Sequence, residues 1–166
     1  VPRGAPALLP AALRPTQPED WDWFWTRTPP PAQDGEPRVR WLDDMADDTL
    51  RSFLKASSPR YSAEPGDRHV RRWCGIVDGD GSVRATAAWT EYVAGVPHLA
   101  SIATHPDARG RGLGAAVTAW ITRELLRSHD WVTLGMYADN ETARRMYRRL
   151  GYRDEHLMTS GEVPRG

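Results

Sequence analysis

The chain has 166 residues, of which 40% are hydrophobic and 27% charged, and its 22 basic and 22 acidic side chains cancel to a formal net charge of zero. This composition predicts one soluble globular domain and argues against a general nucleic-acid binder. The single cysteine, Cys74, excludes an intramolecular disulfide and a thiolate metal site, so we expect no metal.

The ends of the chain and its apolar runs give expectations about processing and location. Residues 1–4 and 163–166 both read Val-Pro-Arg-Gly and resemble remnants of a thrombin-site linker, so we place the single domain at residues 5–161. No apolar run is long enough to span a bilayer and no signal peptide is visible, which predicts a cytoplasmic protein with no membrane partner. Lys55 is the sole lysine beside many arginines, a composition typical of a G+C-rich bacterial genome.

The first third of the chain gives mixed signals. Trp21, Trp23 and Trp25 fit either one strand or the start of a helix, and the residues leave both alternatives open. A short strand is predicted at 38–42, and a helix with an apolar stripe at 43–56. Residues 57–67 contain two prolines and a glycine, and we interpret them as a loop that could wall an acceptor pocket.

The remaining two thirds alternate between strand and helix signals. Residues 70–78 and 82–93 flank the turn sequence Asp-Gly-Asp-Gly and predict a hairpin. The later segments predict, in order, a strand at 98–104, a helix from 113 to 125, a strand at 131–137, a helix that begins after Asn140 and stops at Gly151, and a strand at 152–159. This order predicts a mixed α/β fold, with a sheet packed against helices.

The turn before the predicted helix at 113–125 carries the clearest chemical signal. Residues 109–114 read Arg-Gly-Arg-Gly-Leu-Gly, and glycines at a helix start let unpaired backbone N–H groups approach a ligand. Those N–H groups carry the positive end of the helix dipole, and the arginines add charge-assisted hydrogen bonds. Residues 107–153 also hold nine arginines against five acids. The turn therefore predicts an anion cradle, with phosphate as the expected anion.

Two sequence patterns together resemble those of the GCN5-related N-acetyltransferase (GNAT) family, in its FR47-like bacterial branch. The first is Arg-x-x-Gly-x-Gly at 109–114, and the second is Asn-x-x-Ala-x-x-x-Tyr-x-x-x-Gly-aromatic at 140–152. They occur in the right order with a predicted strand between them, and the resemblance covers about residues 70–157. It implies an acyl-CoA N-acyltransferase fold, in which a mostly antiparallel sheet flanked by helices is splayed between its fourth and fifth strands.

The resemblance also implies a site for acetyl-CoA. The pyrophosphate would be held by the turn at the helix start, that is by Arg109, Gly110, Arg111, Gly112, Leu113, Gly114 and Ala115. The pantetheine arm would pair with the main chain of Ile102, Ala103 and Thr104, where one N–H polarises the acetyl carbonyl. Asn140 and Tyr147 would contact the arm. One or two of the four arginines at 144, 145, 148 and 149 would reach the 3′-phosphate.

Proton transfer leaves several candidates. Tyr147 is the candidate general acid for the leaving thiolate, although its place on the apolar face of a helix also fits a core residue. His98 stands where histone-modifying relatives have a glutamate, and it titrates near neutrality, so it is a candidate general base. Glu91 on the neighbouring strand is the second candidate and solvent water the third.

The predicted activity is direct transfer of an acetyl group from acetyl-CoA to a primary amine of a small molecule or peptide. No cysteine lies in either pattern, which argues against a covalent intermediate on Cys74. The alternative is a non-catalytic acyl-CoA-binding regulatory module on the same fold, and a nucleic-acid binder is disfavoured. The sequence leaves the acceptor and the oligomeric state, monomer or homodimer, open.

Overall fold

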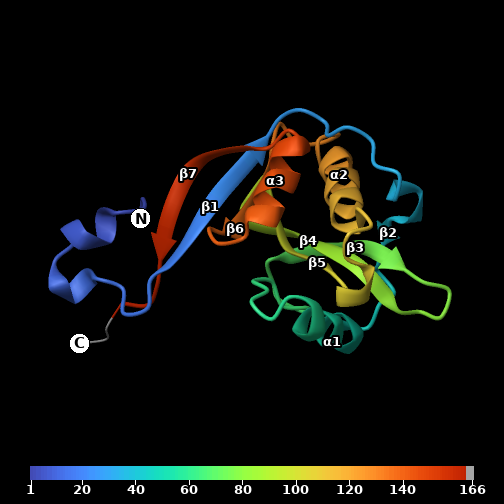
Figure 1. Cartoon of the computed structure of the whole chain (residues 1–166), viewed down its shortest axis with the longest axis horizontal. Coiled ribbons are helices and arrows are strands. Elements are labelled where there is room, and N and C mark those ends of the chain that lie inside the picture. Colours follow the sequence, from blue (N-terminus) through green and yellow to red (C-terminus); the bar gives the residue numbers. More distant parts are fainter. Residues whose placement is uncertain (164–166) are drawn as a thin grey trace. The chain divides into compact units, whose positions relative to one another are not determined.

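The structure, a computed structural model, describes residues 1–163, which fall into two compact units (Figure 1). The central unit comprises residues 26–133, and the terminal unit comprises residues 1–25 together with the chain from residue 134 onward. Seven strands lie within the described residues. Two of them, β1 (Glu19–Thr26) and β6 (Val132–Tyr137), contain residues of both units.

The central unit contains an antiparallel sheet in the order β2-β3-β4-β5. Its strands are β2 (Arg40–Trp41), β3 (Val70–Val77), β4 (Val83–Val93) and β5 (Val96–Thr104). The predicted hairpin is confirmed, because the turn between β3 and β4 is closed by a hydrogen bond from the N–H of Asp78 to the carbonyl of Ser82 at 2.9 Å. β5 begins two residues before the predicted strand and includes Pro97, which lies near its start, where a missing N–H is tolerated.

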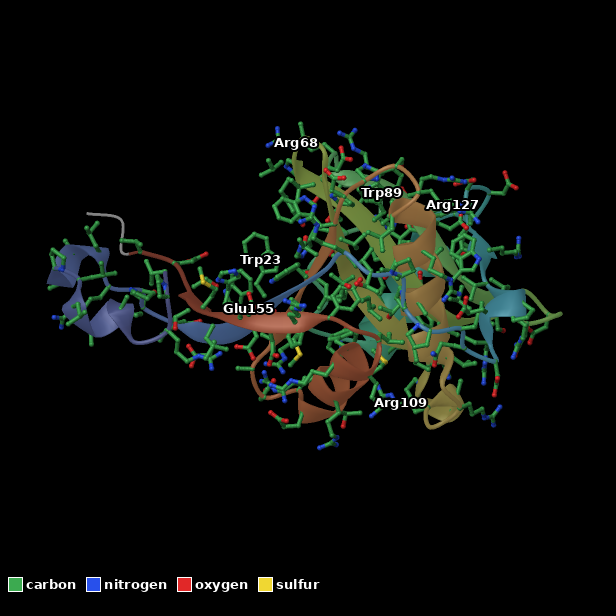
Figure 2. All side chains as sticks on the ribbon, turned by 90° about the horizontal axis from the view of Figure 1, so that it is seen from above. Trp23, Arg68, Trp89, Arg109, Arg127 and Glu155 are labelled. Atoms are coloured by element: carbon green, nitrogen blue, oxygen red, sulfur yellow. The ribbon has the colours of Figure 1, made fainter. Side chains whose placement is uncertain are left out.

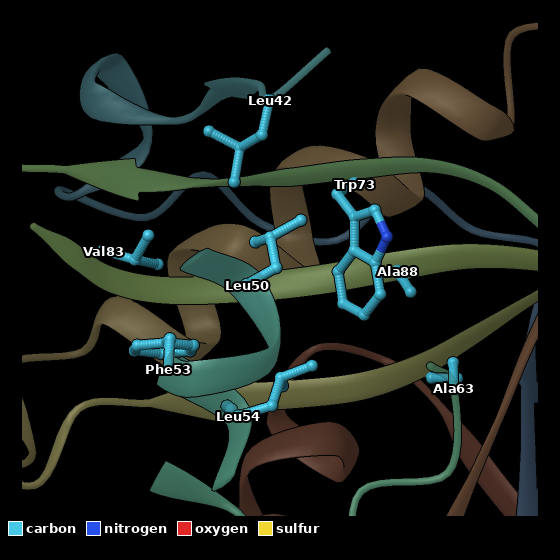
Figure 3. Close-up of a cluster of buried hydrophobic side chains, with 10 residues drawn as sticks. Leu42, Leu50, Phe53, Leu54, Ala63, Trp73, Val83 and Ala88 are labelled. Atoms are coloured by element: carbon cyan, nitrogen blue, oxygen red, sulfur yellow. The ribbon is translucent and has the colours of Figure 1, made fainter. Parts of the chain in front are cut away.

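Helices cover both faces of this sheet, with α1 (Asp47–Ser57) on one and α2 (Leu113–Leu125) on the other (Figure 1). Leu50, Phe53 and Leu54 of α1 pack into a buried cluster with Trp73 and Ala88 of the sheet (Figure 3). The helix starts later than predicted, since the N–H of Met45 closes a turn on Leu42. Thr49, which precedes the buried Leu50, is exposed.

The buried surface of α2 includes polar residues. Thr118 and Thr122 are fully buried, and each hydroxyl donates to a carbonyl one turn earlier, at 2.7 and 2.6 Å. This internal bonding allows hydroxyl groups in the core without loss of hydrogen bonds. Trp120 is only half-buried, and its ring meets Trp41 edge-on with centroids 5.0 Å apart.

The terminal unit contains strands in the order β6-β1-β7, with β7 at Arg153–Ser160, and the helix α3 (Glu141–Arg149). β1 pairs antiparallel with β7 (Figure 1), so the strand alternative for the tryptophan-rich segment is confirmed. Asp22 and Phe24 are fully buried on one face of β1, while the tryptophans occupy the other and Trp23 remains 37% exposed.

The first residues of the chain contact β7. The N–H of Arg3 donates to Leu157, and Thr159 donates to the carbonyl of Val1. The Arg3 guanidinium also forms ion pairs with Asp20 and Asp22. Of the second segment predicted as a linker remnant, residues 164–166 lie outside the described residues.

A buried carboxylate holds the terminal unit together. Asp22 is completely buried and forms ion pairs with Arg144 of α3 and with Arg3. We expect Asp22→Asn to lower the free energy of unfolding by about 1–3 kcal/mol, because it leaves the Arg144 guanidinium, whose side chain is only 11% exposed, without its fully buried charged acceptor. Urea unfolding measures the change. Asp44→Asn, at an exposed position, is the control and should stay within about 0.5 kcal/mol of the wild type; an equal effect of both variants would contradict the assignment.

The predicted fold class is confirmed: a mixed α/β fold whose strands pair mostly antiparallel and are flanked by helices. β5 and β6 start side by side, since the Thr133 hydroxyl donates to the carbonyl of Pro97 at 3.0 Å, and the two strands therefore run parallel. The helix α2 connects them, as expected for a strand–helix–strand unit. This parallel pair corresponds to the fourth and fifth strands of the predicted sheet, where the splay was expected.

Candidate active site

The turn that precedes α2 has the geometry of an anion cradle. Gly110 and Gly112 adopt left-handed backbone conformations, with φ of 75° and 72°, and no atom lies within 4 Å of where a Cβ would stand. The first backbone hydrogen bond of α2 runs from the N–H of Ala116 to Gly112, and no side chain caps the helix. The N–H groups of residues 113–115 therefore remain available to a bound anion, at the positive end of the helix dipole.

The two arginines of this turn differ in their contacts. Arg109 is at the start of α2, at the opposite end from Arg127 (Figure 2), and its guanidinium donates to the carbonyl of Ser57 at 2.9 Å. Arg111 is exposed, and its guanidinium forms no ion pair within the described part of the chain. Arg111 is thus free to meet an anion, whereas Arg109 also ties the turn to the end of α1.

β5 is bulged at the point where the sequence predicts the pantetheine contacts. Ala103 pairs with Thr86 of β4 and Ala100 pairs with Ala88, so two residues of β5 oppose one of β4. Ser101, within this bulge, has φ of 49°, the positive value that a non-glycine residue seldom adopts. Bulges re-aim the chain and are common beside active sites. The sequence alone did not point to Ser101, because the short residues of this strand carry no signal for a bulge.

The predicted cofactor contacts on β5 follow this bulge. Ala103 and Thr104 stay in register with β4, opposite Thr86 and Ala85, whereas Ile102 has no partner in the β4 ladder. Ala103 is buried, and Ile102 and Thr104 are half-buried. All three belong to the central unit, as do the turn at 109–115 and both candidate bases.

His98 lies at the start of β5 in a largely buried position. Its Nδ1 is 3.0 Å from the Thr133 hydroxyl, which itself donates to Pro97. The hydroxyl must therefore accept from Nδ1–H, and this assigns the bare lone pair to Nε2. Burial lowers the pKa of His98 to about 4, well below the near-neutral value expected from the sequence. The neutral imidazole is thus the form present at physiological pH.

Glu91, the second candidate base, lies between an arginine and a histidine. Its side chain is 14% exposed and forms an ion pair with Arg71 at 3.1 Å. On the other side its carboxylate is 3.9 Å from Nε2 of His129. The Glu91 carboxylate is thus held by Arg71, whereas Nε2 of His98 has no hydrogen-bond partner among the described residues. These contacts favour His98 over Glu91 as the base.

Asn140 and Tyr147 belong to the terminal unit. The side-chain oxygen of Asn140 accepts from the N–H of Ala143 at 3.1 Å, so the predicted N-cap of α3 is confirmed and only its amide N–H₂ remains for a ligand. Tyr147 is 5% exposed and packs edge-on against Phe24, with centroids 5.7 Å apart. Burial raises the pKa of the Tyr147 phenol, which therefore stays protonated at neutral pH.

The four arginines of α3 divide into two pairs. Arg144 and Arg148 form ion pairs with Asp22 and Asp154, and these pairs hold the pKa of both guanidinium groups above its usual value. Arg145 and Arg149 are exposed, and no ion pair engages either within residues 1–163. The contacts therefore narrow the candidates for the 3′-phosphate to these last two.

The described residues offer neither a metal site nor a reactive thiol. Among them, no group of three or more His, Cys, Asp or Glu side chains could hold a metal ion. Cys74 is buried in the sheet, and burial raises the pKa of its thiol, which keeps it protonated. Nor is any helix within residues 1–163 both long and apolar enough to cross a bilayer.

Solved structures define the class of this fold. A putative acetyltransferase of the GNAT family from Novosphingobium aromaticivorans superimposes with a TM-score of 0.75 at 22% identity, over 90% of this chain and 66% of that one. A GCN5-related N-acetyltransferase from Sphaerobacter thermophilus gives 0.66 at 21% identity, over 92% and 54%. The chain thus spans about half to two thirds of the length of these structures. Its fold is that of the GCN5-related N-acetyltransferases.

A shorter structure shares the fold, and a family model gives the family. The ribosomal-protein-alanine N-acetyltransferase of Escherichia coli matches with a TM-score of 0.57 at 21% identity, over 68% of this chain and 75% of that one. The family model described as FR47-like protein matches residues 73–159, just over half of the chain. The chain belongs to the FR47-like family.

Proposed function

We propose that the protein is an N-acetyltransferase that moves the acetyl group of acetyl-CoA directly to a primary amine of a small molecule or peptide. The observation that carries this proposal is the anion cradle at the start of α2, with two left-handed glycines, uncapped N–H groups and an exposed arginine. A pyrophosphate is the anion that this arrangement suits, and the family and fold agree with it.

Most of the residues that would hold acetyl-CoA lie on β5 and on the turn that precedes α2. The N–H groups from Arg109 through Ala115 and the Arg111 guanidinium would bind the pyrophosphate, and the main chain of β5 at 102–104 would pair with the pantetheine arm. Asn140 would contact the arm through its amide N–H₂. The co-substrate supplies the activated acetyl thioester, and an N–H of β5 would stabilise the negative charge that develops on the carbonyl oxygen.

Proton transfers are assigned to two side chains. Nε2 of His98 would accept a proton from the acceptor ammonium, directly or through water, so that the free amine can attack the acetyl carbon. As the new C–N bond forms, the C–S bond breaks and the Tyr147 hydroxyl would donate its proton to the leaving sulfur. The proton that the attacking nitrogen loses on acylation would then restore this hydroxyl. Glu91 stays the second candidate base and water the third.

Thiol release from acetyl-CoA tests the activity. The purified chain is incubated with acetyl-CoA and a panel of polyamines, amino acids, aminoglycosides and peptides with free N-termini, and free CoA is followed over time. We expect amine-dependent release with at least one acceptor class. Acetyl-CoA binding in calorimetry without turnover on any amine would instead favour the alternative, a non-catalytic acyl-CoA-binding module. Absence of binding would exclude both.

A matched pair of glycine variants tests the cradle. Gly112→Ala places a methyl group where the cradle is empty, and we expect it to weaken acetyl-CoA binding about tenfold or more because the backbone can no longer approach the pyrophosphate. Gly81→Ala, at the β3–β4 turn, has a similar φ of 87° and an equally empty surrounding, so it bears the same backbone strain. Calorimetry should show unchanged affinity for Gly81→Ala; equal losses in both variants would reject the cradle.

A further inference from the structure

The loop between α1 and β3, residues 58–69, is held by contacts of its own. The N–H of Tyr61 donates to Ser58 at 2.9 Å, and the N–H of Asp67 donates to Glu64 at 3.1 Å. The Arg51 guanidinium of α1 donates to the carbonyl of Pro65 at 3.1 Å. These contacts give the loop a defined shape, but none of them reaches the sheet.

Hydrogen bonds join this loop to the sheet at its end, where the N–H of Glu91 in β4 donates to the carbonyl of His69 at 2.9 Å, and at its middle, where the contact is made by Ser101. Its hydroxyl oxygen accepts from the N–H of Ala63 at 2.9 Å, and the hydroxyl donates to the carbonyl of the same residue at 3.0 Å. Ser101 is 8% exposed and Ala63 is fully buried. One hydroxyl thus satisfies both backbone groups of Ala63, as a neighbouring strand would, and without it both groups would be buried and unpaired.

The backbone at Ser101 indicates that this contact is maintained against a local cost. At φ of 49° glycine is the residue with least strain, and asparagine is the usual second choice. Serine occupies this position although its backbone is strained there. The two hydrogen bonds to Ala63 offset the cost of this strain. Strain of this kind is concentrated at functional sites.

The same loop is tied at its start to the cofactor turn. The carbonyl of Ser57, the last residue of α1, accepts from Arg109, and Ser101 directly precedes Ile102 on β5. The loop is therefore fixed at residues 57 and 63 to the two elements that the proposed function assigns to acetyl-CoA. Its place beside the bulge is where an acceptor would have to approach an acetyl group held on β5.

We propose that Ser101 is a positioning residue that fixes the loop at 58–69 as a wall of the acceptor site, and thereby sets the affinity for the amine. The inference rests on the proposed function. Ser101 touches neither acceptor nor acetyl-CoA through its hydroxyl, which is saturated by Ala63. Its removal therefore changes the KM for the amine and leaves the dissociation constant of acetyl-CoA as it is.

Hydrogen exchange tests the contact without any enzymatic assay. Ser101→Ala and Ser101→Gly both remove the hydroxyl, but the glycine variant also relieves the backbone strain, so the two differ in stability. We expect the Ala63 amide to exchange about tenfold faster in both variants. Thr86→Val is the control, because it also deletes a buried hydroxyl. The Thr86 hydroxyl on β4 donates to the carbonyl of Cys74 on β3 and makes no hydrogen bond to the loop. Unchanged exchange at Ala63 in both Ser101 variants overturns the proposal.

Kinetics with the best acceptor from the amine panel test the consequence. The KM for the amine should rise about tenfold in both Ser101 variants, irrespective of their stability, while calorimetry shows unchanged acetyl-CoA affinity. Thr86→Val should keep the wild-type KM. An unchanged KM for the amine in both Ser101→Ala and Ser101→Gly overturns the proposal. The proposal is also overturned if the KM for the amine rises in proportion to the loss of stability of each variant and rises in Thr86→Val as well. Failure of the wild type to bind acetyl-CoA would instead refute the proposed function.

Discussion

Tyr147→Phe is expected to lower kcat about 10²- to 10⁴-fold, the range of a lost general acid, while acetyl-CoA binding stays nearly unchanged. The ring of Tyr147 packs against Phe24 and Tyr152, and phenylalanine preserves that packing. Only the hydroxyl is removed. Because burial raises the pKa of this phenol, the hydroxyl carries its proton throughout the neutral range, as a donor to a leaving thiolate must.

Steady-state kinetics and calorimetry on the same preparation measure these two quantities. Tyr152→Phe is the matched control, since it deletes a hydroxyl from the adjacent buried ring, and its kcat should stay within about threefold of the wild type. A kcat of Tyr147→Phe within that same narrow range would show that Tyr147 only packs the core. A common loss in both variants would point to damage of the α3 packing.

The parts of the fold that the sequence predicts best are those fixed by local rules. The Asp-Gly-Asp-Gly turn, the glycine-rich start of α2 and the Asn140 cap each depend on residues within a few positions of one another. Backbone preference at glycine and capping by asparagine are properties of the local chain. For the same reason the two motifs predict the family before any long-range contact is known.

Other features depend on distant partners and could not be predicted. β1 is a strand because it pairs with β7 near the other end of the chain. The Asp22 carboxylate buried on one face of β1 is paired with Arg144, which lies 122 residues away in the sequence. The sequence showed only three tryptophans at a spacing that suited either a strand or a helix. Likewise, α1 begins at Asp47 and not at Asp43, because Asp43 is held by Arg72 of β3.

The candidate site also depends partly on contacts between residues that are distant in the sequence. Its backbone elements follow from local sequence, but the protonation of its side chains depends on burial. His98 would titrate near neutrality in a solvated strand start, but burial by the surrounding protein lowers its pKa to about 4. The sequence does not distinguish Arg144 and Arg148 from Arg145 and Arg149 as candidate phosphate ligands. The ion pairs with Asp22 and Asp154, which engage the first two, make this distinction.

The pH dependence of stability provides a direct measurement of the His98 environment. With a pKa of about 4 in the folded state and 6.5 as its ordinary value, His98 binds its proton more readily in the unfolded chain. Its contribution to stability is therefore complete above pH 6.5 and is lost as the pH falls towards 4, by about 3 kcal/mol at most. Thermal unfolding is measured from pH 7.5 to 4 in buffers of matched ionic strength. The midpoint temperature should decline less for His98→Gln than for the wild type.

The same shift sets the expected activity profile and separates the candidate bases. A base with a pKa of about 4 is neutral throughout pH 5–8, so the acid limb of kcat/KM should lie near 4 and not near 6.5. His98→Gln, whose amide can still donate to Thr133, should lower kcat/KM about 10²-fold or more and remove that limb. Glu91→Gln should leave both in place, because its carboxylate is paired with Arg71. A wild-type profile in His98→Gln would exclude His98, and a wild-type profile in both variants would assign the proton to water.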